Sequence, residues 1–165
     1  MPGRRTRKSS ETVRSLLIAL DEAYDHRAWH GTNLRGSLRG LSPAQAFWRP
    51  APRRHNIWEE VLHAAYWKYV LRQRLVGGKR GQFPHKGSNW FSSPESAGAR
   101  EWKQALALLQ ETHDSLLNAV AQFPAARLDQ PLHGRFSAFD AILGVAYHDI
   151  YHAGQIQLLK RLQKA

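Results

Sequence analysis

The sequence predicts an all-α protein that folds as an antiparallel four-helix bundle. Three observations lead to this prediction. Four segments repeat apolar residues at intervals of three and four, which places them on one face of a helix. Each segment opens with residues that commonly cap helices, and three of them end near glycine or proline. No segment shows the alternating pattern of a convincing strand.

Length and composition favour a single domain without disulfides. The 165 residues are enough for one full core, and we expect a basic disordered tail over residues 1–9 followed by one domain over 10–165. Cysteine is absent, so a metal ion would have to be held by His, Asp or Glu. No apolar run approaches the roughly 20 residues of a membrane span. We expect a cytoplasmic protein that does not enter membranes.

The first helix is expected to begin at Ser9 or Ser10, either of which can cap it. Its pattern weakens over residues 28–31, and glycines interrupt a second short segment at 32–39. Ser42 and Pro43 then predict a single helical turn that ends at Phe47. The buried stripe of the first helix is predicted to comprise Val13, Leu16, Leu17, Leu20, Ala23 and Tyr24.

The second helix has a clear predicted start, because Asn56 and Glu59 have the spacing of a capping box. It should end near Val76, where two glycines follow. The helix is apolar on most sides, which indicates burial, and His63 lies in its middle. The irregular stretch 79–93 that follows is either a functional or mobile loop or a crossover pinned by its aromatic residues.

The last two helices are predicted to start at serine caps. The third should begin at Ser93 and end near Phe123, and the fourth should run from Ser137 to about Leu162. In the fourth helix, His148 and His152 are four residues apart, so both lie on the core-facing side, one turn from each other.

Three histidines therefore occupy core-facing helical positions: His63, His148 and His152. One buried imidazole is usually explained by a hydrogen bond, whereas three that converge are better explained by a shared ion. Three neutral histidine ligands leave at least one coordination position open for water or substrate. Nitrogen ligands suit Zn, Ni, Cu or Fe, and we take Zn or Ni as the first expectation.

The segments around these histidines resemble the DinB-like family of bacterial four-helix bundle proteins, also called the DinB/YfiT-like superfamily. The resemblance rests on residues 56–63 with Trp67 and on residues 147–156, and extends to 28–31 and 47–50. It implies a divalent metal held by His63, His148 and His152, and often a homodimer. Characterised relatives include metal-dependent S-transferases that use low-molecular-weight thiols and a thiol-dependent isomerase, so a small thiol is the partner that the resemblance implies.

Some residues near the three histidines are predicted to line the site, and others are predicted to have no role in it. The candidates to line the site are His30, Tyr66, Tyr151 and Gln155. Glu60 is placed to accept a hydrogen bond from an imidazole, but we expect a solvated carboxylate. Asp149 is expected to be exposed, and the remaining histidines have no predicted role. The sequence identifies no catalytic acid or base.

Three functions are compatible with these observations. The leading hypothesis is a metal-dependent transferase or hydrolase whose ion activates a thiol or water. The alternative is a module that binds nucleic acid or another polyanion, because the net charge is +11 and basic residues cluster over 53–86. We do not favour it, since no helix-turn-helix or zinc-finger pattern is present. In the third, the ion only cross-links two helices. The basic cluster on which the nucleic-acid alternative depends comprises Arg53, Arg54, Lys68, Arg72, Arg74, Lys79, Arg80 and Lys86.

Overall fold

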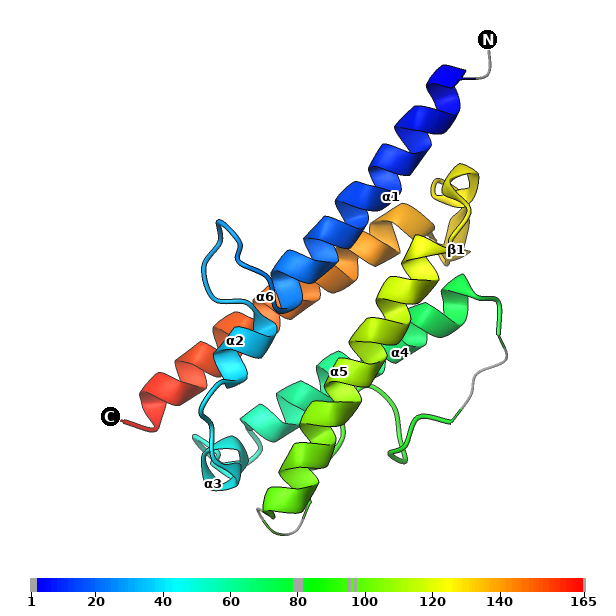
Figure 1. The fold of residues 1–165 in the computed structure, drawn as a ribbon. Helices are drawn as coiled ribbons and strands as arrows, with labels where there is room; N and C mark the ends of the chain where they lie inside the picture. Colours follow the sequence, from blue (N-terminus) through cyan, green and yellow to red (C-terminus); the bar gives the residue numbers. More distant parts are fainter. Residues whose placement is uncertain (1–2, 79–81, 95, 97, 165) are drawn as a thin grey trace.

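The computed structural model describes residues 3–78, 82–94, 96 and 98–164, and it confirms the all-α fold class (Figure 1). The long helices are α1 (Gly3–Tyr24), α4 (Ile57–Leu75), α5 (Ala99–Ala121) and α6 (Ala138–Leu162). Short elements connect them: α2 (Leu34–Leu38), α3 (Pro43–Phe47), a 3-10 turn (Ala125–Arg127), and a hairpin of β1 (Pro131–His133) and β2 (Phe136–Ser137).

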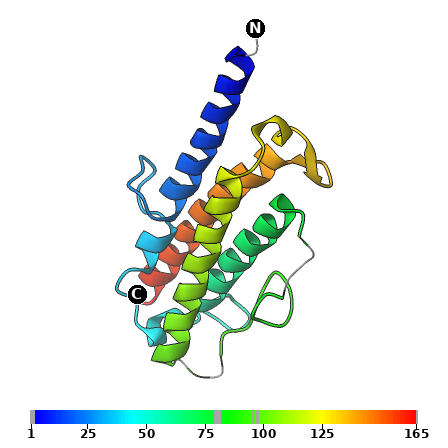
Figure 2. The same ribbon diagram turned by 45° about the vertical axis from the view of Figure 1, so that its right-hand side comes forward.

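The long helices form two pairs that run in opposite directions. Figures 1 and 2 show α1 and α6 running one way and α4 and α5 the other. Consecutive helices α4 and α5 are therefore parallel, because the long connection between them returns the chain to the end of the bundle where α4 starts. Helix α4 packs against both α5 and α6, and α1 packs against the same two helices.

Helix starts at serine and asparagine are confirmed where the cap side chain makes its bond. The Asn56 side chain accepts a hydrogen bond from the backbone N–H of Glu59 at 2.9 Å. Ser137 and Asp140 form a complete capping box at the start of α6, and Ser42 does the same with Gln45 at α3. These local bonds satisfy backbone groups that have no partner within the first helical turn.

Two sequence predictions about helix starts are wrong, and one small element was not predicted. Helix α1 already begins at Gly3 rather than Ser9 or Ser10, since Arg and Lys are good helix formers that extend a helix once it has nucleated; residues 1–2 of the predicted tail lie outside the described residues. Helix α5 begins at Ala99 rather than Ser93, whose hydroxyl accepts a hydrogen bond from the Asn56 side chain instead. The β1–β2 hairpin was not predicted because its strands are too short to show a period.

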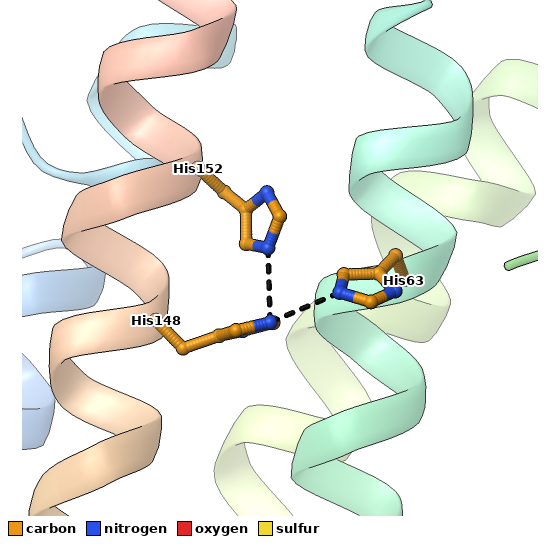
Figure 3. Close-up of side chains that lie close together, drawn as sticks. All are labelled: His63, His148 and His152. Atoms are coloured by element: carbon orange, nitrogen blue, oxygen red, sulfur yellow. Dashed lines mark hydrogen bonds between the residues drawn. The ribbon is translucent and has the colours of Figure 1, made fainter. Parts of the chain in front are cut away.

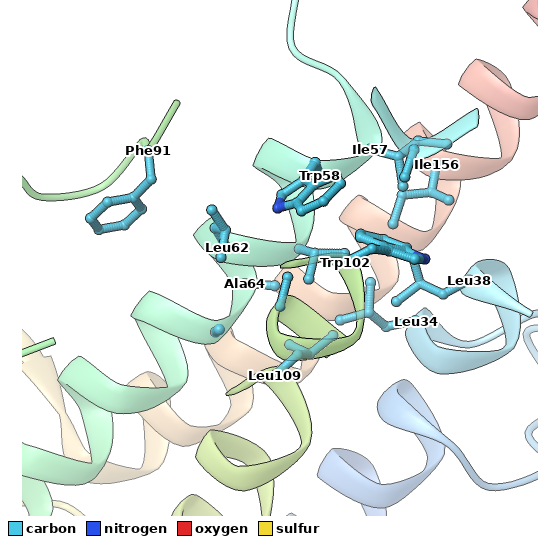
Figure 4. Close-up of a cluster of buried hydrophobic side chains, with 14 of the residues drawn as sticks. Leu34, Leu38, Ile57, Trp58, Leu62, Ala64, Phe91, Trp102, Leu109 and Ile156 are labelled. Atoms are coloured by element: carbon cyan, nitrogen blue, oxygen red, sulfur yellow. The ribbon is translucent and has the colours of Figure 1, made fainter. Parts of the chain in front are cut away.

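Two apolar clusters fill the bundle, and a layer of polar side chains lies between them. One cluster is drawn in Figure 4 and includes Trp58, Leu62 and Trp102; the other includes Leu20, Leu116 and Ile142. On α4, α5 and α6, buried polar residues separate the members of one cluster from those of the other, with Thr112 beside His113 on α5 and His152 one turn after Asp149 on α6. Three of these buried polar residues contact one another or the same ring: Lys68, His113 and Asp149.

Lys68 and Asp149 form an ion pair whose side chains are both 0% exposed. Lys68 also lies over the ring of Tyr24, with Nζ 5.1 Å from the ring centroid, and the His113 ring stacks on the same Tyr24 ring with 3.8 Å between the centroids. Burial raises the pKa of Asp149 and lowers the pKa of Lys68, and their mutual attraction offsets only part of each shift. Burial also lowers the pKa of His113 to about 2, so this imidazole is neutral.

This ion pair corrects two expectations. Asp149 was expected to be exposed, and Lys68 was counted in the surface basic cluster, but both are completely buried. Two further members of the predicted cluster, Lys79 and Arg80, lie outside the described residues. Within the part of the chain that the structure describes, no helix has both the length and the apolar character to cross a membrane.

Replacing Lys68 alone should be far more destabilising than replacing both partners. We expect Lys68→Met to lower the free energy of unfolding by about 3–5 kcal/mol, because it leaves Asp149 as an uncompensated buried charge. The double variant Lys68→Met/Asp149→Leu should recover most of this loss, since it removes both charges. Urea denaturation measures each value.

The matched control for this experiment is Lys103→Met, which removes an exposed lysine from α5. It should change the free energy of unfolding by less than about 0.5 kcal/mol. Equal stability of Lys68→Met and Lys103→Met would contradict a structural role for the buried pair.

Candidate metal centre

Three imidazoles meet between α4 and α6, as Figure 3 shows. His63 extends from α4, and His148 and His152 extend from successive turns of α6. The Nε2 atom of His148 lies 3.0 Å from Nε2 of His63 and 2.9 Å from Nε2 of His152. His63 and His152 are buried and His148 is half-buried. The structure thus brings together all three residues that the sequence singled out as metal ligands.

The opposite nitrogen of two of these rings is fixed by an acceptor. Nδ1 of His63 donates to the backbone carbonyl of Asn89 at 2.7 Å, and Nδ1 of His152 donates to the carboxylate of Glu60. Each of these rings therefore carries its proton on Nδ1 and directs the lone pair of Nε2 at His148. Nε2 of His148 has at most one proton to donate. Therefore at most one of its two short contacts, to His63 or to His152, can be a good hydrogen bond.

A divalent cation fits this arrangement of donors. The Nε2 lone pairs that converge here outnumber the protons available to pair with them, and a cation would accept them. Divalent cations such as zinc bind neutral imidazoles. Burial lowers the pKa of His63 to about 4 and that of His148 to about 3, so both rings are neutral near pH 7. Tetrahedral nitrogen ligands of zinc are about 3.3 Å apart, so the rings need only a small outward movement.

The long connection between α4 and α5 supplies one wall of the centre. The Trp90 ring stacks on His63 with 3.9 Å between ring centroids, and His55 stacks on Trp90 at 3.6 Å. Asn89 is in the left-handed region at φ 68°, and its side chain accepts a hydrogen bond from Trp67 at 2.9 Å. This segment therefore holds the His63 ring by a carbonyl on one atom and an indole on one face.

Comparison with known proteins assigns the family. The sequence profile of the DinB superfamily matches residues 24–156, a range that contains all three histidines. This chain belongs to the DinB superfamily. Neither a curated protein nor a solved structure matches the chain significantly. The membership confirms the predicted family and the helical fold, and the histidine cluster of this DinB protein is a candidate site for a metal ion.

The residues predicted to line the centre lie in three different surroundings. Tyr151 and Gln155 line a cavity beside His152, with the Tyr151 ring 5.1 Å from the His152 ring. Tyr66 instead packs edge-on against Phe83 and lines a larger cavity of about 970 Å³ under the α4–α5 connection, away from the histidines. His30 is exposed and lines neither cavity.

Two consecutive glutamates have separate roles that the sequence did not reveal. Glu60 was expected to be solvated, but it is 5% exposed and bonded to His152. Glu59 was expected to complete the capping box, yet its carboxylate is bonded to Arg49 at 2.6 and 3.0 Å and to His55 at 2.8 Å. Burial alone would raise the pKa of Glu59, but the hydrogen bonds from Arg49 and His55 hold it below its usual value.

Sequence reasoning also missed the contribution of the segment 89–90. A backbone carbonyl, such as that of Asn89, carries no sequence signal because every residue has one. Trp90 did have a signal, because a large apolar indole in a long polar connection is expected to pack against another side chain. The two interpretations of this connection both find support, because Phe91 is buried in the core while Asn89 and Trp90 contact His63.

Removing the charge of Glu60 should weaken metal binding. We expect Glu60→Gln to lower the affinity for Zn²⁺ by about 10–100-fold, because a neutral amide makes the His152 imidazole a weaker donor of its lone pair. Competition with a chromophoric chelator measures the affinity. Glu59→Gln is the matched control: it removes the neighbouring carboxylate, which contacts none of the three candidate ligands, and should leave zinc affinity unchanged. Wild-type affinity in Glu60→Gln would refute the role of this carboxylate.

Proposed function

We propose that this DinB protein is a divalent-metal-dependent enzyme, and specifically a transferase that uses a low-molecular-weight thiol or water. The observation that carries the proposal is the convergence of three Nε2 atoms beside a cavity. Two of the three rings, those of His63 and His152, are also fixed by hydrogen bonds from Nδ1. A bound divalent ion would lower the pKa of a thiol or water that reaches its free coordination position. Zinc or nickel suits an all-nitrogen set of ligands.

The residues of the chain have distinct tasks in this proposal. His63, His148 and His152 hold the ion, while Glu60 and the Asn89 carbonyl keep two of the rings oriented. Trp90 covers one face of His63 and keeps bulk water from that side. Fixed ligand orientation leaves a free coordination position in one direction, which is the requirement for reaction at a defined point in the cavity.

Loss of one histidine ligand should remove the metal and the activity together. Wild-type protein purified without chelators should contain about one equivalent of divalent metal per chain, and His63→Ala should contain almost none. Elemental analysis measures the metal, and alkylation of a small thiol by a fluorogenic haloalkane measures transfer. The exposed His30→Ala is the matched control and should keep both the metal and the transfer rate.

The same samples separate a catalytic ion from a structural one. A chelator that abolishes transfer but leaves the melting temperature unchanged supports catalysis, whereas a large fall in melting temperature without any thiol transfer in the loaded protein supports a structural ion. A correctly folded wild-type protein that binds no divalent metal would overturn the proposal.

We also propose that the protein is a homodimer that uses an exposed stripe on α6. Four large apolar side chains project from this helix at intervals of four, seven and four residues, which places them on one face, with exposed fractions of 44–62%. Such a stripe favours contact with another apolar surface. It is adjacent on the helix to the face that bears His148 and His152, so a second copy would border the metal centre. The stripe comprises Tyr147, Tyr151, Leu158 and Leu162.

A charge in this stripe should separate the dimer. Sedimentation velocity of the wild type is expected to give a dimer, and Tyr147→Glu should give a monomer, because a carboxylate in an apolar interface loses its hydration. Ile18→Glu places the same charge at an exposed apolar position of α1 and should remain dimeric. A wild type that stays monomeric at 100-fold higher concentration than needed for detection would contradict the proposal.

A further inference from the structure

A cavity of about 410 Å³ adjoins the metal centre on the side of Glu60 and His152. It lies between the turn that precedes α4, the Trp90 indole and the C-terminal half of α6. Most of its wall is apolar, and Leu158 and Leu159 contribute from α6. The turn contributes a different group, the charged side chain of Arg54. The cavity thus combines an apolar wall with a cation at its edge.

The turn that carries Arg54 is held in a costly conformation. The Arg54 N–H donates to the carbonyl of Ala51 at 3.2 Å, which closes a turn with Pro52 and Arg53 at its centre. Arg53 is in the left-handed region at φ 64°, a conformation that a residue with a Cβ atom rarely adopts. Backbone strain of this kind persists only where surrounding contacts fix the chain.

Arg49 supplies those contacts. Its guanidinium donates both to the backbone carbonyl of Arg54 and to the Glu59 carboxylate on α4. His55 donates to the same carboxylate. The turn is therefore tied to the first turn of α4, and Arg54 has a fixed place relative to Glu60, which follows Glu59 on that helix.

The acidic groups near Arg54 are already paired. Glu59 is bonded to Arg49 and His55, and Glu60, which also lines the cavity, is bonded to His152. Among the described residues, the Arg54 guanidinium has no hydrogen-bond or ion-pair partner. A guanidinium without a partner beside apolar surface is suited to a carboxylate, sulfonate or similar anion whose other end is apolar.

We propose that this cavity binds a small organic anion with an apolar body. The anionic group pairs with Arg54, and the apolar body lies against Trp90 and Leu159, which is not part of the proposed dimer stripe. The inference rests on the proposed function in one respect: it names this anion as the class of substrate that reaches the metal centre. Arg54 is then a residue that determines specificity, and it has no contact with the three histidines in the structure.

The test compares 2-naphthoate with its neutral amide, 2-naphthamide, on full-length protein stripped of metal. The two probes share an apolar body and differ in charge. Isothermal titration calorimetry should show that the wild type binds 2-naphthoate about tenfold more tightly than the amide, a ratio typical of one charge-assisted contact. The indole N–H signal of Trp90, assigned with Trp90→Phe, should shift with both probes because the apolar body contacts this ring.

Arg54→Gln should abolish the preference for the anion while leaving the affinity for the amide unchanged. Arg14→Gln removes an exposed arginine of α1 that does not line the cavity, so it controls for net charge and should keep the preference. Equal affinity of the wild type for both probes, failure of both to bind at 1 mM, or a preference that survives Arg54→Gln would each overturn the inference.

The outcome is separable from that of the proposed function. Because metal-free protein is used, the preference for the anion is measured whether or not the histidines bind a metal. A protein that binds no metal but keeps an Arg54-dependent preference would refute the metal-dependent enzyme and retain the anion site. A protein that holds zinc but has no such preference would do the reverse.

Discussion

The buried ion pair between Lys68 and Asp149 joins α4 to α6 at a depth that solvent does not reach. Sliding one helix by a turn would leave two separated charges in an apolar core, at a cost of several kilocalories per mole for each. The pair therefore allows one register. In that register His63, five positions before Lys68, faces the residue that directly precedes Asp149, which is His148. The geometry of the candidate metal centre thus depends on a contact outside the three histidines.

The parts of the fold that sequence reasoning predicted correctly are those determined by neighbours in the chain. The caps at Asn56 and Ser137 are made within three residues, and the pairing of His148 with His152 follows from one turn of helix. The ion pair joins residues 81 positions apart, and nothing local distinguishes its charges from solvated ones. A charged residue on a helix is normally assigned to the surface, so Lys68 and Asp149 were misplaced for a sound general reason.

Glu59 and Glu60 show why adjacent residues of the same type cannot be assigned by pattern alone. They differ by about 100° around the axis of α4, so one faces the preceding turn and the other faces α6. Glu59 accepts hydrogen bonds from Arg49 and His55, and these bonds fix the turn beside the cavity. Glu60 receives His152 and orients a candidate ligand. Their roles follow from which element packs on each side of the helix, and that is decided by the tertiary fold.

His148 differs from the other two histidines in a way that bears on how the centre would take up an ion. Within the described part of the chain its Nδ1 is buried without a hydrogen-bond partner, so no neighbour fixes its tautomer. With its proton on Nε2, His148 can donate a hydrogen bond to the lone pair of either His63 or His152. With its proton on Nδ1, His148 adds a third lone pair to the two that already face it. The second arrangement is poor in the absence of a cation and favourable in its presence, because all three lone pairs then have an acceptor. His63 and His152, held from behind, supply a fixed pair of donors, and His148 completes the set by moving one proton between its own nitrogens.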